Sequence, residues 1–234
     1  MKKKSVKKIV LGLIVFFVLL GFGAIIYVND YYAASDYVEV LMEENNSRIT
    51  RQGQYISIQP QGISDEKVGM IFYPGGKVEA IAYMPLLLQL ADRGIRSVLV
   101  EMPGNLAVLD MNAANDVFGM YEDIDQWYIA GHSLGGAMAS QYMEKNHQKV
   151  QGMILLGAYP VNNAPVDSLV IYGTHDLLLD LEQVKRADEI YEIKDGNHAY
   201  FGDYGEQEDD GKAKISHEQQ QKETVNRIME FIER

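Results

Sequence analysis

Short apolar runs alternate with longer segments of helical spacing along most of the chain. The runs are rich in β-branched and aliphatic residues and are bounded by Gly, Pro, Asp or Asn, which is typical of buried strands. They comprise residues 56–58, 68–73, 97–100, 127–130, 152–156, 169–172 and 191–193. The segments with helical spacing comprise residues 80–93, 109–121, 134–145, 181–189 and 216–232. Strands that alternate with helices predict an α/β fold, with a mostly parallel central sheet and helices on both faces.

The N-terminal segment has a different pattern. Five lysines lie within the first eight residues, and residues 9–28 contain no charged side chain. A helix needs about 20 apolar residues to cross the ~30 Å hydrocarbon core of a bilayer. The sequence therefore predicts a cytoplasmic basic segment at residues 1–8 and one transmembrane helix or signal anchor at residues 9–28.

The lysine cluster also predicts an orientation. Lysine-rich flanks stay in the cytoplasm, so the chain is predicted to be a single-pass protein of the cell membrane with its C-terminal part outside. Cleavage of a signal peptide, followed by secretion, is the alternative, because Ala33 and Ala34 lie just downstream. The uncharged run is longer than the roughly 7–15 residues of a signal-peptide core, which favours the uncleaved anchor.

Two further segments follow the predicted span. Residues 29–54 are predicted to form a juxtamembrane segment with a short helix at 36–44, and residues 55–234 carry the strand and helix pattern of a folded domain. The whole chain has 234 residues, of which 47% are hydrophobic and 23% charged. These values fit one globular domain of moderate size.

Composition excludes several kinds of site. The chain has no cysteine, which removes disulfides, thiolate zinc sites and cysteine nucleophiles. Its net charge of −12 argues against nucleic-acid binding, which requires a basic surface. The acidic run at residues 206–210 lacks the spacing of an EF-hand loop, so it predicts a solvated loop. We expect no metal site and no cofactor, and nothing in the sequence indicates an oligomeric state.

Ser133 is the predicted nucleophile. It lies in a Gly-His-Ser-Leu-Gly motif directly after the predicted strand 127–130 and directly before the predicted helix 134–145. A serine in this G-x-S-x-G context sits on a strained turn, and Gly131 and Gly135 remove the side chains that would collide with it.

A serine hydroxyl needs a base, and the base needs an acid that orients it. Asp176 follows the strand 169–172, and His198 follows the last predicted strand, which gives the order Ser, Asp, His. Asp180 is the alternative acid, although an N-cap for the helix that starts at residue 181 is its favoured role. His132 is expected to be a packed neighbour of the nucleophile.

Two backbone N–H groups must also stabilise the oxyanion that forms during acyl transfer. Leu134, next to the nucleophile, is predicted to supply one. The Pro-Gly-Gly-Lys loop after residues 68–73 is predicted to supply the other, from Gly76 or Lys77. Pocket walls are predicted to come from short loops, with four candidate substrate-binding residues: Asn105, Tyr159, Tyr200 and Phe201.

Taken together, residues 55–234 resemble the alpha/beta hydrolase superfamily. Three segments resemble its small bacterial branch related to dienelactone hydrolases: Phe72-Tyr-Pro-Gly-Gly-Lys-Val-Glu79, Met102-Pro-Gly-Asn-Leu106 and Gly196-Asn-His-Ala-Tyr-Phe-Gly202. The resemblance implies an alpha/beta hydrolase fold, a Ser133, His198 and Asp176 triad, and hydrolysis of an ester or similar bond. The stretch at 158–167, where lid domains are usually inserted, has no room for a cap domain.

The predicted function is therefore that of a serine hydrolase of carboxylesterase type, which cleaves a small-molecule acyl substrate through an acyl-enzyme intermediate. The alternative is a membrane-tethered binding or scaffolding protein that keeps the fold without turnover, because a fold alone does not guarantee activity.

Overall fold

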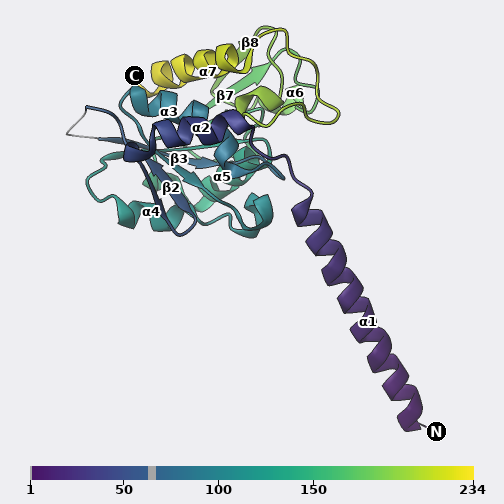
Figure 1. The fold of residues 1–234 in the computed structure, drawn as a ribbon. Coiled ribbons are helices and arrows are strands. Elements are labelled where there is room, and N and C mark those ends of the chain that lie inside the picture. The colour runs from purple at the N-terminus through teal and green to yellow at the C-terminus, as the bar shows by residue number, and fades with distance from the viewer. Residues whose placement is uncertain (1, 63–66) are drawn as a thin grey trace. The chain divides into compact units, whose positions relative to one another are not determined.

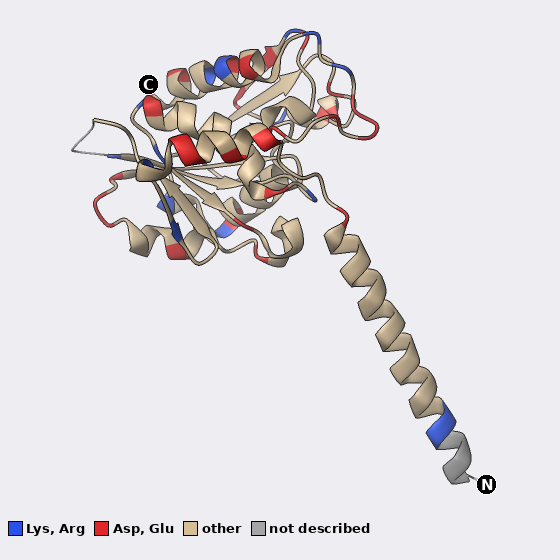
Figure 2. Ribbon diagram, in the orientation of Figure 1, with Lys and Arg blue, Asp and Glu red and all other residues tan. Residues whose placement is uncertain are grey.

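The computed structural model describes residues 2–62 and 67–234, with no side-chain detail for residues 2–6, and divides into two compact units between Tyr31 and Tyr32. The first unit consists mainly of the helix α1 (Lys2–Asn29). Its side chains from Ile9 to Tyr27 are exposed and almost all apolar, and Figure 2 shows no charged residue along that stretch. In the described part of the chain, α1 is the one helix long and apolar enough to cross a membrane.

The second unit is built on an eight-stranded sheet with the order β1-β2-β4-β3-β5-β6-β7-β8 (Figure 1). The strands are β1 (Ile49–Gln52), β2 (Tyr55–Ile58), β3 (Val68–Tyr73), β4 (Arg96–Val100), β5 (Gln126–His132), β6 (Gly152–Leu156), β7 (Asp167–Gly173) and β8 (Glu189–Ile193). Pairing is antiparallel from β1 through β2 to β4 and parallel from β4 to β8. The predicted mostly parallel sheet is confirmed.

Helices cover both faces of the sheet. The α-helices of this unit are α2 (Asp36–Glu44), α3 (Met84–Asp92), α4 (Ala114–Met120), α5 (Leu134–Asn146), α6 (Leu181–Val184) and α7 (His217–Ile232). Buried side chains of α2, α3 and α7 belong to one core cluster, and those of α4, α5 and α6 belong to a second. Figure 1 shows α2, α3 and α7 on one side of the sheet and α4 on the other. The predicted three-layer α/β architecture is therefore present.

Several elements differ in length from the sequence pattern. The predicted helix 80–93 begins as a 3₁₀ turn (Ala80–Tyr83), and α3 starts at Met84, because Pro85 fits only the first turn of a helix. α4 and α6 are shorter than predicted: α6 ends at Val184, and β8 begins at Glu189, the last residue of the predicted helix 181–189.

The compact unit also begins earlier than residue 55. Val38 of α2 is completely buried in the core, and β1 pairs with β2. Residues 32–54 therefore belong to the folded unit instead of forming a separate connecting segment.

Candidate active site

The loop between β5 and α5 places Ser133 in a strained conformation. Its φ of 50° and ψ of −120° lie outside the regions that a side chain usually allows, and its N–H donates to the Leu156 carbonyl at 3.0 Å. Glycine is required beside it, because a Cβ on Gly135 would lie 2.1 Å from the Pro74 carbonyl oxygen. The turn thus has the geometry of a nucleophile elbow, as the sequence predicts.

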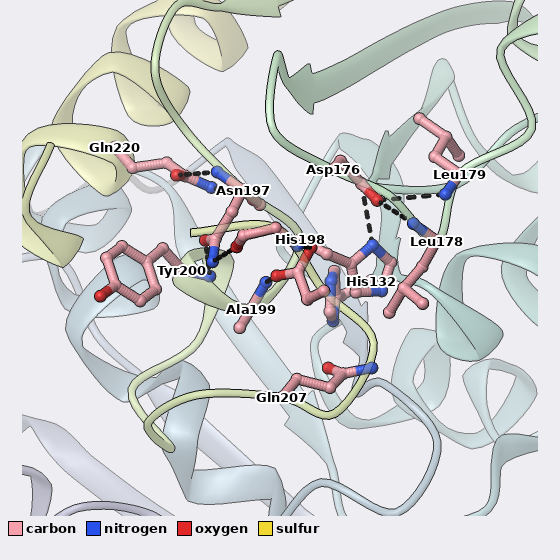
Figure 3. A network of polar contacts seen from close by, with 12 residues as sticks. His132, Asp176, Leu178, Leu179, Asn197, His198, Ala199, Tyr200, Gln207 and Gln220 are labelled. Atoms are coloured by element: carbon pink, nitrogen blue, oxygen red, sulfur yellow. Dashed lines mark hydrogen bonds and ion pairs between the residues drawn. The ribbon is translucent and has the colours of Figure 1, made fainter. Parts of the chain in front are cut away.

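The loops after β7 and β8 bring Asp176 and His198 together. His198 Nδ1 lies 2.8 Å from Asp176 Oδ2, and both side chains are buried, with 2% and 0% exposure (Figure 3). The other carboxylate oxygen accepts from the N–H groups of Leu178 and Leu179 at 3.0 and 3.1 Å. An ionised carboxylate can only accept, so Nδ1 of His198 is the atom that donates to Asp176, and in the neutral ring Nε2 then holds a lone pair.

The second ring nitrogen of His198 is the candidate base. Within residues 2–62 and 67–234, its Nε2 is buried and has no hydrogen-bond partner. His198 and Ser133 line the same hollow, so the base and the hydroxyl share one space. Hydrogen bonds between such groups are often long in unliganded enzymes and tighten when substrate is bound.

Asp180, the alternative acid, has a different partner. It is the N-cap of α6, and its Oδ1 accepts from the Glu182 N–H at 3.0 Å. This is the capping role that the sequence favours for it. The structure therefore joins His198 to Asp176.

The two glycines after β3 lie against the elbow. A Cβ on Gly76 would lie 2.7 Å from Leu134 Cδ2, so the two predicted oxyanion donors are neighbours. Neither the Gly76 N–H nor the Leu134 N–H donates to an acceptor within the described residues. Lys77 differs, because its N–H donates to the Asn105 carbonyl at 2.8 Å. Of the two alternatives in this loop, Gly76 is the one with a free donor.

The hollow beside the elbow has a volume of about 290 Å³. Its lining residues are Ser133, Leu134, Ala137, Gly157, Ala158, Tyr159, Leu178, Leu179 and His198. None of these nine residues carries a permanent charge. The walls are therefore largely apolar, and Tyr159 is the one predicted substrate-binding residue among them.

The other three predicted substrate-binding residues lie elsewhere. Asn105 contributes its carbonyl to the loop that carries Lys77, and Tyr200 stacks on His217 with ring centroids 3.6 Å apart. Phe201 is completely buried in the core and offers no surface to a substrate. An aromatic residue that follows a catalytic loop can pack inward or outward, and the sequence pattern does not distinguish the two.

Three histidines outside the predicted triad differ in burial. His132 is completely buried, and burial together with the neighbouring His198 lowers its pKa well below the usual value. His217 is half-buried, and burial lowers its pKa as well. His175 is partly exposed and lies 3.4 Å from Asp195. The expectation of a packed His132 agrees with the structure, and the ring of His217 stacks on Tyr200.

Sequence reasoning missed the residues that hold the His198 loop. The buried side chain of Gln220 on α7 accepts from the Asn197 N–H at 3.0 Å and donates to the Asn197 carbonyl at 2.8 Å (Figure 3). Asp210 accepts from the Ala199 N–H at 2.9 Å, so a residue of the acidic run 206–210 secures the residue after His198. No motif predicts these contacts, because their partners are backbone groups far away along the chain.

Gly157 leads to a direct test of this geometry. Its φ is +51°, and a Cβ there would lie 2.8 Å from His198 Nδ1 and 3.1 Å from Asp176 Oδ2. We expect Gly157→Ala to lower kcat at least about 100-fold, because small displacements of reacting groups have effects of that size. Gly53→Ala is the matched control, since its φ is +59° and a Cβ there meets nothing within 4 Å. Near-normal activity of a folded Gly157→Ala protein would show that the paired side chains are not needed.

Sequence comparison identifies the family. The sequence model described as the alpha/beta hydrolase family matches residues 69–222, which is more than half of the chain. The chain belongs to the alpha/beta hydrolase family. The membership that the sequence motifs predict is thereby confirmed. The matched residues include the elbow, both partner loops and the beginning of α7 of this hydrolase.

Solved structures agree with this assignment. Est1E from Butyrivibrio proteoclasticus is 14% identical, with a TM-score of 0.58 over 80% of this chain and 98% of that one. The dienelactone hydrolase from Anabaena variabilis is also 14% identical, with a TM-score of 0.57 over 78% and 95%. MenH from S. aureus is 10% identical, with a TM-score of 0.59 over 78% and 98%. At these identities the likeness shows the fold. No curated protein matches the chain by sequence.

Proposed function

We propose that this hydrolase is a serine hydrolase that cleaves a small ester or related acyl bond through an acyl-enzyme intermediate. In this proposal Ser133 is the nucleophile, His198 the general base and Asp176 the acid that orients it. The observation that carries the proposal is the 2.8 Å contact between His198 and Asp176, which leaves Nε2 without a partner in a residue that lines the same hollow as Ser133. Such an acid, base and nucleophile arrangement is what activates a serine hydroxyl.

The proposed reaction follows from these positions. Ser133 Oγ attacks the acyl carbon while His198 Nε2 takes its proton, and the N–H groups of Leu134 and Gly76 stabilise the oxyanion. His198 then gives the proton to the departing alcohol. Water, activated by the same base, releases the acid product and restores Ser133. Asp176 stabilises the imidazolium at each stage.

The hollow supports a preference for short acyl groups. Residues 157–166, between β6 and β7, contain no helix or strand that could serve as a lid. Each buried CH₂ contributes about 0.8 kcal/mol, so a hollow that covers only a few carbons gains nothing from a longer chain. For p-nitrophenyl esters of graded length, we expect kcat/KM to peak at a short or medium acyl length. Interfacial activation combined with a preference for long-chain triglycerides would contradict this expectation.

A non-catalytic binding or scaffolding role is the competing function. A fluorophosphonate probe distinguishes the two, because it reacts with an activated serine and not with an ordinary one. Labelling of the full chain at Ser133 supports the hydrolase. A folded chain that is not labelled supports the scaffold.

We further infer that α1 anchors the hydrolase in the membrane, with the catalytic unit on the extracytoplasmic side. The support comes from the apolar surface of α1 and from the lysines at its start. Secretion after signal cleavage remains the alternative, and the N-terminal residue of the mature protein separates the two.

Orientation has its own test. Protease added to intact cells should digest the unit that begins at Tyr32, whereas a cytoplasmic marker protein should survive. Complete protection in intact cells, with digestion only after permeabilisation, would show the orientation to be wrong.

A chain that starts at Tyr32 should unfold at the same denaturant concentration as the full chain, because α1 forms a compact unit of its own.

A further inference from the structure

A buried hydrogen-bonded network joins Gly75, Tyr83 and His132 beside the proposed site, and none of the three has a role in the proposed reaction. It begins at the Gly75 N–H, which donates to the hydroxyl oxygen of Tyr83 at 3.0 Å. The same hydroxyl lies 2.7 Å from Nδ1 of His132. Both side chains are completely buried. A buried hydrogen-bonded network of this kind is expensive to leave incomplete, so it fixes the groups that it joins.

The protonation states of Tyr83 and His132 indicate which of the two donates in the bond between them. Burial raises the pKa of the Tyr83 phenol far above its usual range and lowers that of His132, so both groups are neutral. The phenol oxygen already accepts from Gly75, and its O–H has no acceptor other than His132 in the described part of the chain. Tyr83 therefore donates to Nδ1, and His132 carries its hydrogen on Nε2, which is buried and has no hydrogen-bond partner within the described residues.

This network contacts three parts of the proposed active site. Gly75 adjoins Gly76 in the loop at residues 74–77, which we call the oxyanion loop. A Cβ on Gly75 would lie 2.8 Å from both His132 Nδ1 and the Tyr83 oxygen. His132 ends β5 and immediately precedes Ser133. The His132 ring also packs on the ring of His198, with centroids 4.5 Å apart.

We propose that Tyr83 and His132 are positioning residues that hold the oxyanion loop and the base in register with Ser133. This inference rests on the proposed serine hydrolase function. Neither side chain needs to touch the substrate. Tyr83 fixes the loop through the Gly75 N–H, and His132 supports one face of the base while Asp176 orients its edge.

The first test is Tyr83→Phe in the full chain, with a p-nitrophenyl ester as substrate. Phe fills the same space but leaves the Gly75 N–H and His132 Nδ1 unpaired. We expect kcat to fall about 10- to 100-fold with KM little changed, because a displaced Gly76 N–H stabilises the oxyanion of the transition state less well. The rate of labelling by a fluorophosphonate should fall by a similar factor.

The second test separates positioning from packing. In His132→Asn, the side-chain oxygen takes the place of Nδ1 and can still accept from Tyr83, whereas His132→Leu has no acceptor. We expect Asn to restore part of the activity that Leu loses. The double variant Tyr83→Phe with His132→Leu should be no slower than the slower single variant, because both substitutions break one network.

Tyr142→Phe is the matched control. Tyr142 is buried to the same degree and donates to Asn115 Oδ1 at 2.9 Å, outside the proposed site. It should lose stability without losing kcat. Wild-type kcat in folded Tyr83→Phe, or equal losses in Tyr83→Phe and Tyr142→Phe, would overturn the positioning role. A wild-type chain that the probe does not label would overturn the proposed function together with this inference.

Discussion

Ser133→Ala is expected to abolish acyl ester hydrolysis, with a fall in kcat on the order of 10⁶. The expected loss is this large because the hydroxyl forms the acyl-enzyme in the proposed mechanism. Any residual rate over water would come from the oxyanion donors and from substrate binding. The measurement is steady-state hydrolysis of a short p-nitrophenyl ester by the purified variant, together with loss of fluorophosphonate labelling.

Ser97→Ala is the control for this variant. Ser97, on β4, is completely buried, and its hydroxyl donates to the Leu87 carbonyl of α3 at 3.5 Å. We expect this substitution to leave kcat unchanged. Near wild-type activity in Ser133→Ala would mean that another group is the nucleophile.

Asp176→Asn is expected to lower kcat on the order of 10⁴, whereas Asp180→Asn should change it little. An amide at position 176 no longer fixes the His198 tautomer, so Nε2 loses the lone pair that takes the serine proton. An amide at position 180 still accepts from Glu182 and keeps the N-cap of α6. The two variants carry the same substitution four residues apart, so each controls for the other.

The relative activities of Asp176→Asn and Asp180→Asn identify the acid that orients His198. If Asp180→Asn is the more damaging change, the acid is Asp180 and the contact between Asp176 and His198 is structural. Equal and small effects would remove both carboxylates from the mechanism. Unfolding midpoints of the two variants show whether a loss of activity reflects a loss of fold.

The sequence predicts the sheet and the loops at its carboxyl edge well, for a physical reason. Parallel strands covered on both faces must be apolar along their length, so runs such as Gly152–Leu156 stand out from their surroundings. The elbow is equally visible, since the collisions around Ser133 and Gly135 leave almost no freedom in the choice of residue. These features are local, and a local pattern is sufficient to find them.

Other parts of the candidate site depend on contacts that no local pattern contains. Lys77 and Gly76 are indistinguishable as oxyanion donors until the Asn105 carbonyl engages one of them. Phe201 resembles a pocket residue until the fold buries it. Tyr83, from the turn before α3, meets His132 only because β3 and β5 are adjacent in the sheet. Tertiary packing decides each of these cases.

The main chain and the side chains of Leu178 and Leu179 have different roles at the hollow. Their main-chain N–H groups hold the carboxylate of Asp176, while the two residues also line the hollow. Any residue other than proline supplies the same N–H group. If the proposed function holds, substitutions at these two positions change which acyl groups fit the hollow, while the main-chain bonds to the Asp176 carboxylate stay the same. A lineage descended from this chain could acquire new substrates at these two positions without first losing its reaction.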